Sequence, residues 1–277
     1  MTIWNAILLG LIQGITEFLP VSSSGHLSIL SNLFDVTTAE GGHILCSVFA
    51  HLGTLTAIFL IYWQDIKQMF YELLGLVNAG PLAGSNQRRY PAARLFMMIF
   101  IASLPLLMVL PVNKMMKLLY SNSIFIGVML ILTGCLLFVG GKMSEGKKSA
   151  GGMTILDAVI VGICQCIATV PGLSRAGTTI TAGIATGFNK EFAVKFSFLL
   201  SIPAMIAANI MSLVDAFKQG IDVSSIPAYI VGMIAAMLSG LAAISLMRYL
   251  AKKAKLNGFA YYCWIIGALS IILTMIF

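Results

Sequence analysis

Two charged residues in this 277-residue sequence stand inside long apolar stretches. Glu17 is the only acidic residue in the first 34 positions, and Arg175 is the only basic residue between positions 149 and 189. Placing an ionised group in apolar surroundings is costly, so such groups pair, bind a ligand or react. Glu17 and Arg175 are therefore the first candidates for a functional site, and a structural ion pair between them is compatible with that role.

The residues around Glu17 add nucleophilic and acid–base groups. Gln13 lies four positions before Glu17, so the two share one face of a helix. Beyond Pro20 come three consecutive serines, Ser22–Ser24, and then His26. A carboxylate, hydroxyls and an imidazole in one short segment are suited to proton transfer and nucleophilic attack. Serines before a helix also accept hydrogen bonds from its first N–H groups, so capping is an alternative for at least one of them.

The residues around Arg175 are suited to binding an anion. The guanidinium offers a planar fork of donors that matches phosphate geometry. Glycine lets the backbone approach an anion, hydroxyls add donors, and the start of the following helix adds a positive dipole end. The candidate binding residues here are Ser174, Gly177, Thr178 and Thr179. Because donors dominate, the pattern predicts a phosphate or diphosphate ligand and is compatible with phosphoryl transfer.

The composition places these segments in a membrane. Hydrophobic residues make up 59% of the chain, only 10% are Asp, Glu, Lys or Arg, and the mean hydropathy is +0.96. These values exclude a soluble enzyme, a disordered chain and a disulfide-rich secreted domain. They predict an all-α polytopic membrane protein surrounded by lipid, with a substrate that carries a lipid portion. The net charge of +7 does not indicate nucleic-acid binding, because the basic residues lie in short loops.

The apolar segments are of two kinds. Six are long enough to span a bilayer as a helix, which takes about 20 residues. They are 44–63, 92–112, 122–141, 192–213, 225–247 and 258–277. Two others, 3–33 and 153–188, are interrupted in the middle by Pro, Gly and hydroxyl residues. Since free backbone groups at membrane depth must line a cavity or be buried in protein, we expect two re-entrant helix–turn–helix hairpins there.

The two interrupted segments repeat each other at a distance of 152 residues. That shift aligns identical residues, namely Gly10 with Gly162, Gln13 with Gln165, Ile15 with Ile167, Ser22 with Ser174 and Gly25 with Gly177. Each segment is followed by three spanning helices, an odd number, so we expect the second repeat to be inverted relative to the first. The prediction is a single membrane domain over 1–277, with repeats over about 1–141 and about 153–277.

The basic residues of the connecting segments predict an orientation. Their number alternates between high and low along the chain, and the connections after the first, third and fifth spanning helices are the basic ones. The first of these is the 64–91 linker. By the positive-inside rule these three connections are cytoplasmic and both termini lie outside. We therefore expect the hairpins to enter from opposite sides and their tips to meet near the midplane.

Two motifs resemble those of a known family. The run Glu17-Phe-Leu-Pro-Val-Ser-Ser-Ser-Gly-His26 resembles the first signature of the bacterial undecaprenyl-diphosphate phosphatases, the bacitracin-resistance family. The run Pro171-Gly-Leu-Ser-Arg-Ala-Gly177 resembles the second, and the segment 196–203 also looks like part of this family. Both motifs are long and specific, and the similarity in length and span order covers essentially the whole chain.

The resemblance implies a multi-pass enzyme of the bacterial plasma membrane, with its active site toward the outer face. Such an enzyme hydrolyses undecaprenyl diphosphate to undecaprenyl phosphate and inorganic phosphate, which recycles the lipid carrier for peptidoglycan and other envelope polymers. It also confers bacitracin resistance, because bacitracin binds the diphosphate form. The resemblance further implies dependence on a divalent cation, Mg²⁺ or Ca²⁺.

The resemblance also implies roles for single residues. Glu17 looks like the essential carboxylate, and Ser23 and His26 look like the nucleophile and acid–base group. The catalytic candidates are Glu17, Ser23, His26 and Arg175, and the binding candidates are Ser22, Ser24, Ser174, Gly177, Thr178 and Thr179. The family often has a second glutamate at the position of Gln13. Glu17, with Gln13 nearby, would therefore have to hold the cation together with substrate oxygens.

Three points stay open at this stage. Ser23 or His26 attacks the terminal phosphorus, or His26 activates the nucleophile. An inverted-repeat transporter or flippase of a lipid phosphate is the main alternative to an enzyme, because secondary transporters also use broken helices that meet at the midplane. The sequence does not specify an oligomeric state, and a homo-oligomer is compatible with it.

Overall fold

Helices account for almost all of the described chain. The computed structural model describes residues 1–34, 42–76, 90–112, 118–144, 146–219, 223–253 and 256–276. These ranges contain no β-strand, and their single isolated bridge joins Lys148 to Phe188. They form eleven α-helices and two 3₁₀ helices: α1 (Ile3–Phe18), α2 (Ser23–Phe34), α3 (Gly42–Ile61), α4 (Trp63–Leu76), α5 (Pro91–Ser103), η1 (Leu104–Val112), α7 (Ser123–Lys142), α8 (Ile155–Ile167), α9 (Arg175–Ala185), α10 (Lys190–Gln219), η2 (Val223–Ser225), α11 (Ile226–Lys252) and α12 (Asn257–Ile276).

Six helical segments of the described chain are long and apolar enough to cross a membrane, which confirms the predicted all-α membrane fold. They are Ile44–Ile61, Pro91–Val109, Ser123–Lys142, Lys190–Lys218, Ile226–Lys252 and Asn257–Ile276. Helices α10 and α11 continue beyond the predicted ends at 213 and 247, because helix-forming polar residues follow their apolar parts. The span that begins with α5 changes to a 3₁₀ helix at Leu104, immediately before Pro105, which disfavours further α-helix.

The 64–91 segment differs from the predicted linker, because its first half forms the amphipathic helix α4. Near the end of α4, the buried carboxylate of Glu72 accepts hydrogen bonds from the N–H groups of Ala92 (2.7 Å) and Ala93 (2.9 Å). Glu72 thereby satisfies the first free donors of α5, which starts at Pro91 and has no side-chain cap of its own. The remainder of the linker, residues 77–89, lies outside the described residues.

Each interrupted segment forms two helices separated by a short break. Helices α1 and α2 flank residues 19–22, and α8 and α9 flank residues 168–174. The first residues of α1 and α2 correspond to those of α8 and α9 at the same shift of 152 residues that aligns the two sequences. Each break contains a residue with a left-handed backbone, Ser22 (φ 70°) and Gly172 (φ 87°), which turns the chain between the two helices.

The first helix of each pair packs against a spanning helix of the other half of the chain. Helix α1 lies against α11, and α8 lies against α5 and η1. Glycines permit this close approach. A Cβ atom added at Gly10 would lie 2.2 Å from the carbonyl oxygen of Gly232, and one added at Gly162 would lie 2.4 Å from that of Ala102. In lipid, close packing at small residues is a principal source of helix association, so these contacts hold the halves together.

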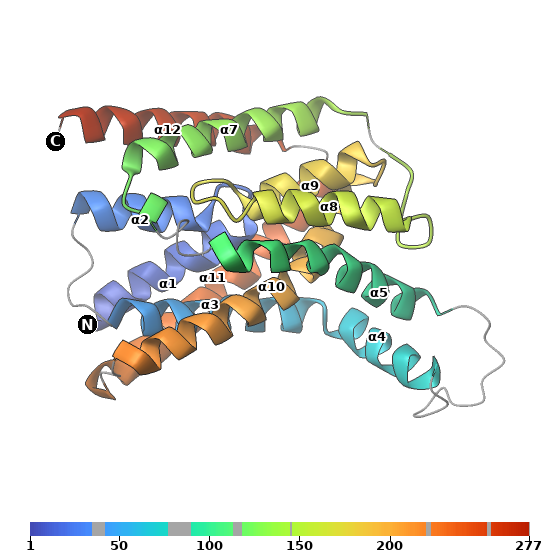
Figure 1. Ribbon diagram of the computed structural model, residues 1–277, viewed down its shortest axis with the longest axis horizontal. Coiled ribbons are helices and arrows are strands. Elements are labelled where there is room, and N and C mark those ends of the chain that lie inside the picture. The colour runs from blue at the N-terminus through green and yellow to red at the C-terminus, as the bar shows by residue number, and fades with distance from the viewer. Residues whose placement is uncertain are drawn as a thin grey trace.

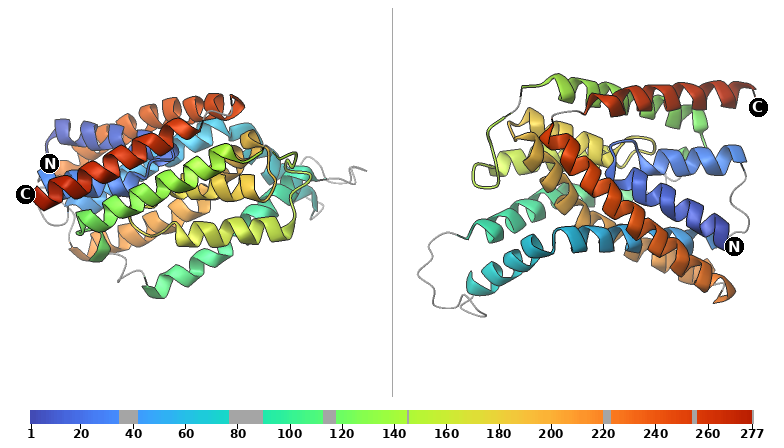
Figure 2. Two further views of the ribbon diagram at one scale, coloured as in Figure 1. Left: turned by 90° about the horizontal axis from the view of Figure 1, so that it is seen from above. Right: turned by 180° about the vertical axis from the view of Figure 1, so that it is seen from behind.

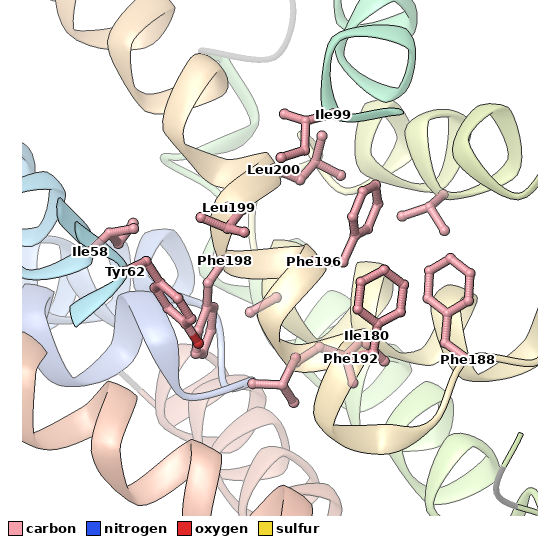
Figure 3. Packing of buried hydrophobic residues seen from close by; sticks show 14 of the residues in the cluster. Ile58, Tyr62, Ile99, Ile180, Phe188, Phe192, Phe196, Phe198, Leu199 and Leu200 are labelled. Atoms are coloured by element: carbon pink, nitrogen blue, oxygen red, sulfur yellow. The ribbon is translucent and has the colours of Figure 1, made fainter. Parts of the chain in front are cut away.

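The largest apolar cluster fixes α9 against α10. Figure 3 shows the rings of Phe192 and Phe196 beside Phe188 and Ile180, with side chains from α3 and α5 closing the cluster. The ring centroid of Phe188 lies 4.9 Å from that of Phe192 and 5.8 Å from that of Phe196. Because α9 begins at Arg175, this cluster also fixes the position from which the arginine side chain extends.

The helices run roughly along the long axis of the molecule, and both chain termini lie at the same end (Figure 1). The α1–α2 pair lies toward that end and the α8–α9 pair toward the other, as the view from behind in Figure 2 also shows. The connections from α3 to α4, from α7 to α8 and from α11 to α12 all lie toward the end away from the termini. The three most basic connecting segments of the sequence, 64–91, 142–148 and 248–255, adjoin or include these connections.

Candidate active site

Glu17 and Arg175, the two charges singled out in the sequence, form an ion pair between the two helix pairs. Nη2 of Arg175 donates a hydrogen bond to Oε1 of Glu17, and Nη1 donates to the backbone carbonyl of Ser201 on α10 at 3.4 Å. Glu17 lies in the last turn of α1 and is buried, while Arg175 starts α9 and is partly accessible. Two residues 158 positions apart are thus joined at the point where both interrupted segments break.

The second carboxylate oxygen of Glu17 holds a hydroxyl and an amide. Oε2 accepts hydrogen bonds from Oγ of Ser23 at 2.7 Å and from Nε2 of Gln13 at 3.0 Å. The Gln13 contact follows from the spacing of four residues on one helix face, as the sequence predicts. The Ser23 contact requires the chain to fold back at 19–22. A hydroxyl that donates to a carboxylate can lose its proton to that carboxylate when it attacks an electrophile.

His26 is held by a backbone carbonyl on one side and by a tyrosine on the other. Nδ1 lies 2.8 Å from the carbonyl oxygen of Ser22, and Nε2 lies 2.8 Å from the hydroxyl of Tyr262 on α12. A carbonyl oxygen only accepts, so Nδ1 of the neutral ring carries the proton and Nε2 accepts from Tyr262. The two rings also stack at 5.6 Å with an interplanar angle of 5°. Nε2 is therefore the nitrogen available for proton transfer.

The breaks of the two segments touch each other. Ser24 Oγ accepts a hydrogen bond from the N–H of Gly172 at 3.4 Å and lies 3.3 Å from Ser22 Oγ. A Cβ atom at Gly25 would lie 3.4 Å from Cα of Gly172. Ser22 Oγ accepts from the N–H of Gly25 at 3.2 Å, which caps the first turn of α2. Ser22 and Ser24 thus shape the turn and join it to the second break.

The candidate binding residues of α9 fall into two groups. Ser174 Oγ caps the N–H of Gly177 at 3.1 Å, and Thr179 Oγ1 is engaged by Ser197 Oγ at 2.6 Å and by the carbonyl of Arg175 at 2.8 Å. Thr178 differs, because its Oγ1 is buried without a hydrogen-bond partner. Thr178 is therefore the hydroxyl of this group that is free to donate to a ligand.

Two helix N-termini converge on this site. Helix α2 begins at Ser23 and α9 begins at Arg175, and each contributes its first N–H groups and a positive dipole end. Together with the guanidinium, these groups favour an anion beside Ser23. The arrangement can hold a phosphate group by its charge and place a hydroxyl next to it, which are the main requirements of phosphoryl transfer.

Oxygen ligands for a hard cation are few. Across the described ranges, no group of three or more His, Cys, Asp or Glu side chains is close enough to hold a metal ion. The amide oxygen of Gln13 is buried without a hydrogen-bond partner, next to Glu17. Because Mg²⁺ and Ca²⁺ prefer oxygen ligands, Gln13 Oε1 and Glu17 fit such an ion as part of a set that substrate oxygens complete.

Comparison with known proteins identifies the family of this chain. The family described as bacitracin resistance protein BacA matches residues 6–269 of the chain. The protein belongs to the BacA family. Several relatives named undecaprenyl-diphosphatase resemble it along its whole length. The protein from Alkaliphilus metalliredigens is 37% identical, and the alignment covers 100% of both chains. The one from Halothermothrix orenii is 36% identical over 100% of both, and the one from Methanosphaera stadtmanae is 34% identical over 100% of this chain and 99% of its own.

Three supporting residues of the candidate site do not follow from the motifs alone. Thr133 on α7 accepts a hydrogen bond from the N–H of Ser174 at 3.0 Å, Ser197 contacts Thr179, and Tyr262 contacts His26. Thr133 is the only hydroxyl residue between positions 124 and 142, a signal that the sequence does offer. Ser197 lies within the family-like segment 196–203. Tyr262 has no distinguishing signal, because tyrosines near helix ends are common in membrane proteins.

Proposed function

We propose that this protein is a membrane phosphatase that hydrolyses undecaprenyl diphosphate to undecaprenyl phosphate and inorganic phosphate. The undecaprenyl-diphosphatase names of full-length relatives support this substrate. The observation that carries the proposal is the placement of Ser23 on a buried carboxylate that is itself paired with Arg175. The product is the lipid carrier for peptidoglycan and other envelope polymers. Consumption of the diphosphate form, which bacitracin binds, confers resistance to that antibiotic.

The second helix pair binds the diphosphate. Arg175 offers a two-donor fork to phosphate oxygens, and the free hydroxyl of Thr178 adds a third donor. Ser22, Ser24, Ser174, Gly177 and Thr179 form the turns and caps that hold the backbone around the phosphate. The N-termini of α2 and α9 complete the charge complementarity for a ligand with several negative charges.

The first helix pair carries out the reaction. Ser23 Oγ attacks the terminal phosphorus and its proton passes to Oε2 of Glu17, 2.7 Å away. A bond forms between Ser23 Oγ and phosphorus, and the bond from that phosphorus to the bridging oxygen breaks. Undecaprenyl phosphate leaves with the electron pair. Water then hydrolyses the phosphoserine, which releases inorganic phosphate and restores the Ser23 hydroxyl.

His26 serves the water step. Its Nδ1 is committed to the carbonyl of Ser22, so Nε2 is the nitrogen that accepts a proton from the attacking water. Tyr262 is a positioning residue, since its stacked ring and its hydroxyl orient the imidazole before substrate arrives. This assignment favours Ser23 as the nucleophile, because its hydroxyl already donates to the carboxylate that takes its proton.

A divalent cation, Mg²⁺ or Ca²⁺, is part of the proposal. Glu17 and the unpartnered amide oxygen of Gln13 would hold it, together with oxygens of the substrate. When bound, it supplies charge neutralisation for the diphosphate. The single carboxylate makes the ion dependent on substrate, so the free protein should bind it weakly.

The proposed architecture is an inverted repeat with two re-entrant hairpins, α1–α2 and α8–α9. The reciprocal packing of α1 on α11 and of α8 on α5 supports it, because a pseudo-twofold axis produces such exchanged pairs. The repeats are about 1–141 and about 153–277. We assign the end with the basic connections to the cytoplasm and the termini to the outside of the plasma membrane, with the site facing outward.

Phosphate release tests the proposal. Purified protein in detergent is incubated with undecaprenyl or farnesyl diphosphate, with phosphatidic acid for comparison, and with or without a chelator. We expect phosphate release from the prenyl diphosphates, loss of release with chelator, and a phosphoenzyme trapped on Ser23. A flippase for the same lipid binds it without releasing phosphate. Binding without release by folded protein would therefore contradict the phosphatase and favour the flippase.

A further inference from the structure

A polar cleft of about 360 Å³ lies apart from the active site, and no residue of the Glu17–Arg175 site lines it. The end of α3, the start of α4, the first turns of α10 and the last turns of α11 form its walls. Its polar and charged side chains include Tyr62, Asp65, Asn189, Lys195, Arg248 and Lys252. These residues come from four helices, so the cleft depends on the tertiary fold.

Two cations in this cleft lack a counter-ion. Lys195 pairs with Asp65 at 2.5 Å, but Arg248 and Lys252 form no hydrogen bond or ion pair with the described part of the chain. They are four residues apart on α11, so they share a face and repel each other. Glu191 also lines the cleft, but it is exposed and pairs with neither. Two like charges on one face of a cleft favour an anionic ligand.

Tyr62 adds a second indication. Its side chain is 4% exposed, and its buried hydroxyl has no hydrogen-bond partner. The guanidinium carbon of Arg248 lies 5.7 Å from the centroid of the Tyr62 ring, so the ring restricts the arginine side chain. Asn189 Oδ1 accepts a hydrogen bond from the N–H of Phe192 at 2.8 Å and caps the start of α10. This helix N-terminus adds a positive dipole end. The cleft therefore presents an ordered cation rather than a loose surface charge.

The level of the cleft in the molecule indicates the kind of anion. Three apolar spans end at this level: one at Ile61, one at Lys190 and one at Lys252. The cleft is thus located at the boundary between the apolar belt and water, with Ile61, Phe192 and Ala251 among its lining. A ligand that fills it has an anionic head and an apolar remainder.

We propose that this cleft binds the phosphate headgroup of an anionic phospholipid from the adjacent leaflet, through Arg248 and Lys252. Basic pockets between membrane helices are the general means by which such headgroups are recognised. Inorganic phosphate shares the charge but makes no use of the apolar lining. The site is independent of the phosphatase activity, since it lies outside the residues that bind the diphosphate.

Lipid binding to purified protein tests this site. Detergent-solubilised protein is titrated with phosphatidylglycerol, phosphatidylcholine or inorganic phosphate, and retained ligand is measured by native mass spectrometry. We expect phosphatidylglycerol to bind more tightly than phosphatidylcholine. Arg248→Ala and Lys252→Ala should each weaken phosphatidylglycerol about fivefold to tenfold, the effect of one interfacial cation. Arg248→Lys should retain most of the binding.

Lys253→Ala is the matched control. Lys253 follows Lys252 directly, carries the same charge and contacts the Tyr249 ring at 4.5 Å, outside the cleft. It should leave phosphatidylglycerol binding unchanged. Equal weakening by Lys253→Ala, or equal binding of both lipids, would mean general surface attraction and would overturn the proposal. Binding of inorganic phosphate that depends on Arg248 and displaces phosphatidylglycerol would overturn the lipid assignment. Phosphate release by each variant is measured separately, so a failure here does not affect the proposed reaction.

Discussion

The α1–α2 and α8–α9 pairs share one turn but carry different chemistry. In the first, Ser22 Oγ caps the N–H of Gly25 at 3.2 Å, and in the second, Ser174 Oγ caps the N–H of Gly177 at 3.1 Å. These residues correspond at the shift of 152 positions, so the same serine–glycine turn is built twice. The repeated residues are therefore those that start a helix at the break, and their repetition is accounted for by capping.

The residues next to this shared turn differ in type between the two pairs. At the same shift, Ser23 corresponds to Arg175 and His26 to Thr178. The first pair thus presents groups that are able to exchange protons or attack, and the second presents donors that are able to bind an anion. Two helix pairs that share a turn can bring the N-termini of two helices to one ligand while each pair has its own side chains. The predictions below test this division.

The largest effect is expected from removing the binding charge. Arg175→Ala should lower phosphate release by about 10³–10⁵-fold, as for arginines that stabilise phosphoryl transfer. It also leaves Glu17 buried and unpaired, which should destabilise the protein by about 3–5 kcal/mol. Thermal unfolding in detergent and phosphate release are measured together. The double variant Glu17→Gln, Arg175→Ala should regain stability but not activity. Activity near that of the parent in Arg175→Ala would show that the second pair is not the anion binder.

The second largest effect is expected at Ser23, and the adjacent Ser24 should show a much smaller one. Ser23→Ala should lower phosphate release about 10²–10⁴-fold, because the hydroxyl on Glu17 is lost. Ser24→Ala is the matched control. Its hydroxyl contacts Ser22 and the N–H of Gly172, so the loss should stay below about tenfold. If the two variants lose equal activity, Ser23 has no special role in the reaction.

The two glutamines that align at the shift of 152 residues provide a third test. Gln13 donates to Glu17, whereas both side-chain polar atoms of Gln165 are buried without a partner. Gln13→Leu should lower phosphate release about tenfold, since it removes a hydrogen bond to a charged group. Gln165→Leu should leave activity unchanged and leave the unfolding temperature unchanged or higher. A loss of activity in Gln165→Leu equal to that in Gln13→Leu would mean that the second pair also takes part in the chemistry.

The smallest effect is expected at Tyr262. Tyr262→Phe retains the stacked ring but loses the hydroxyl on His26 Nε2, and phosphate release should fall about fivefold. The pH dependence of the rate should also shift, because Nε2 accepts from the Tyr262 hydroxyl only while the imidazole is neutral. Tyr261→Phe is the matched control, because the ring of Tyr261 packs on Phe138 and Trp264. Loss of its hydroxyl should change neither the rate nor the pH profile. An unchanged pH profile in Tyr262→Phe would exclude its positioning role.

Most of the helical framework follows from the sequence, because length and hydropathy define a spanning helix. The helix α4 does not follow, since its polar residues resemble those of a linker and its role depends on contact with α5. Glu72 illustrates this, because its partners Ala92 and Ala93 lie 20 and 21 residues away. Local spacing contains no information about which distant N–H groups a carboxylate will cap.

A residue of the candidate site can be predicted from the sequence when its type is rare in the segment that contains it. Glu17 and Arg175 are visible because charges are rare in apolar segments, and the structure brings them into contact. Tyr262 and Ser197 are not visible in the same way, because their roles arise from how α12 and α10 pack beside the breaks. The role of His26 also changes once its two partners are known, since neither of them is Ser23.

Because the two halves exchange partners, the first half of the chain cannot complete its packing alone. Gly10 and Gly14 of α1 pack against α11, which is synthesised roughly 220 residues later. At about 5–20 residues per second, α1 waits roughly 10–45 s for this partner. Glu17 has no Arg175 to pair with during most of that time, because Arg175 is synthesised much later. A newly inserted first half therefore contains a carboxyl group whose ion-pair partner is absent until Arg175 has been synthesised.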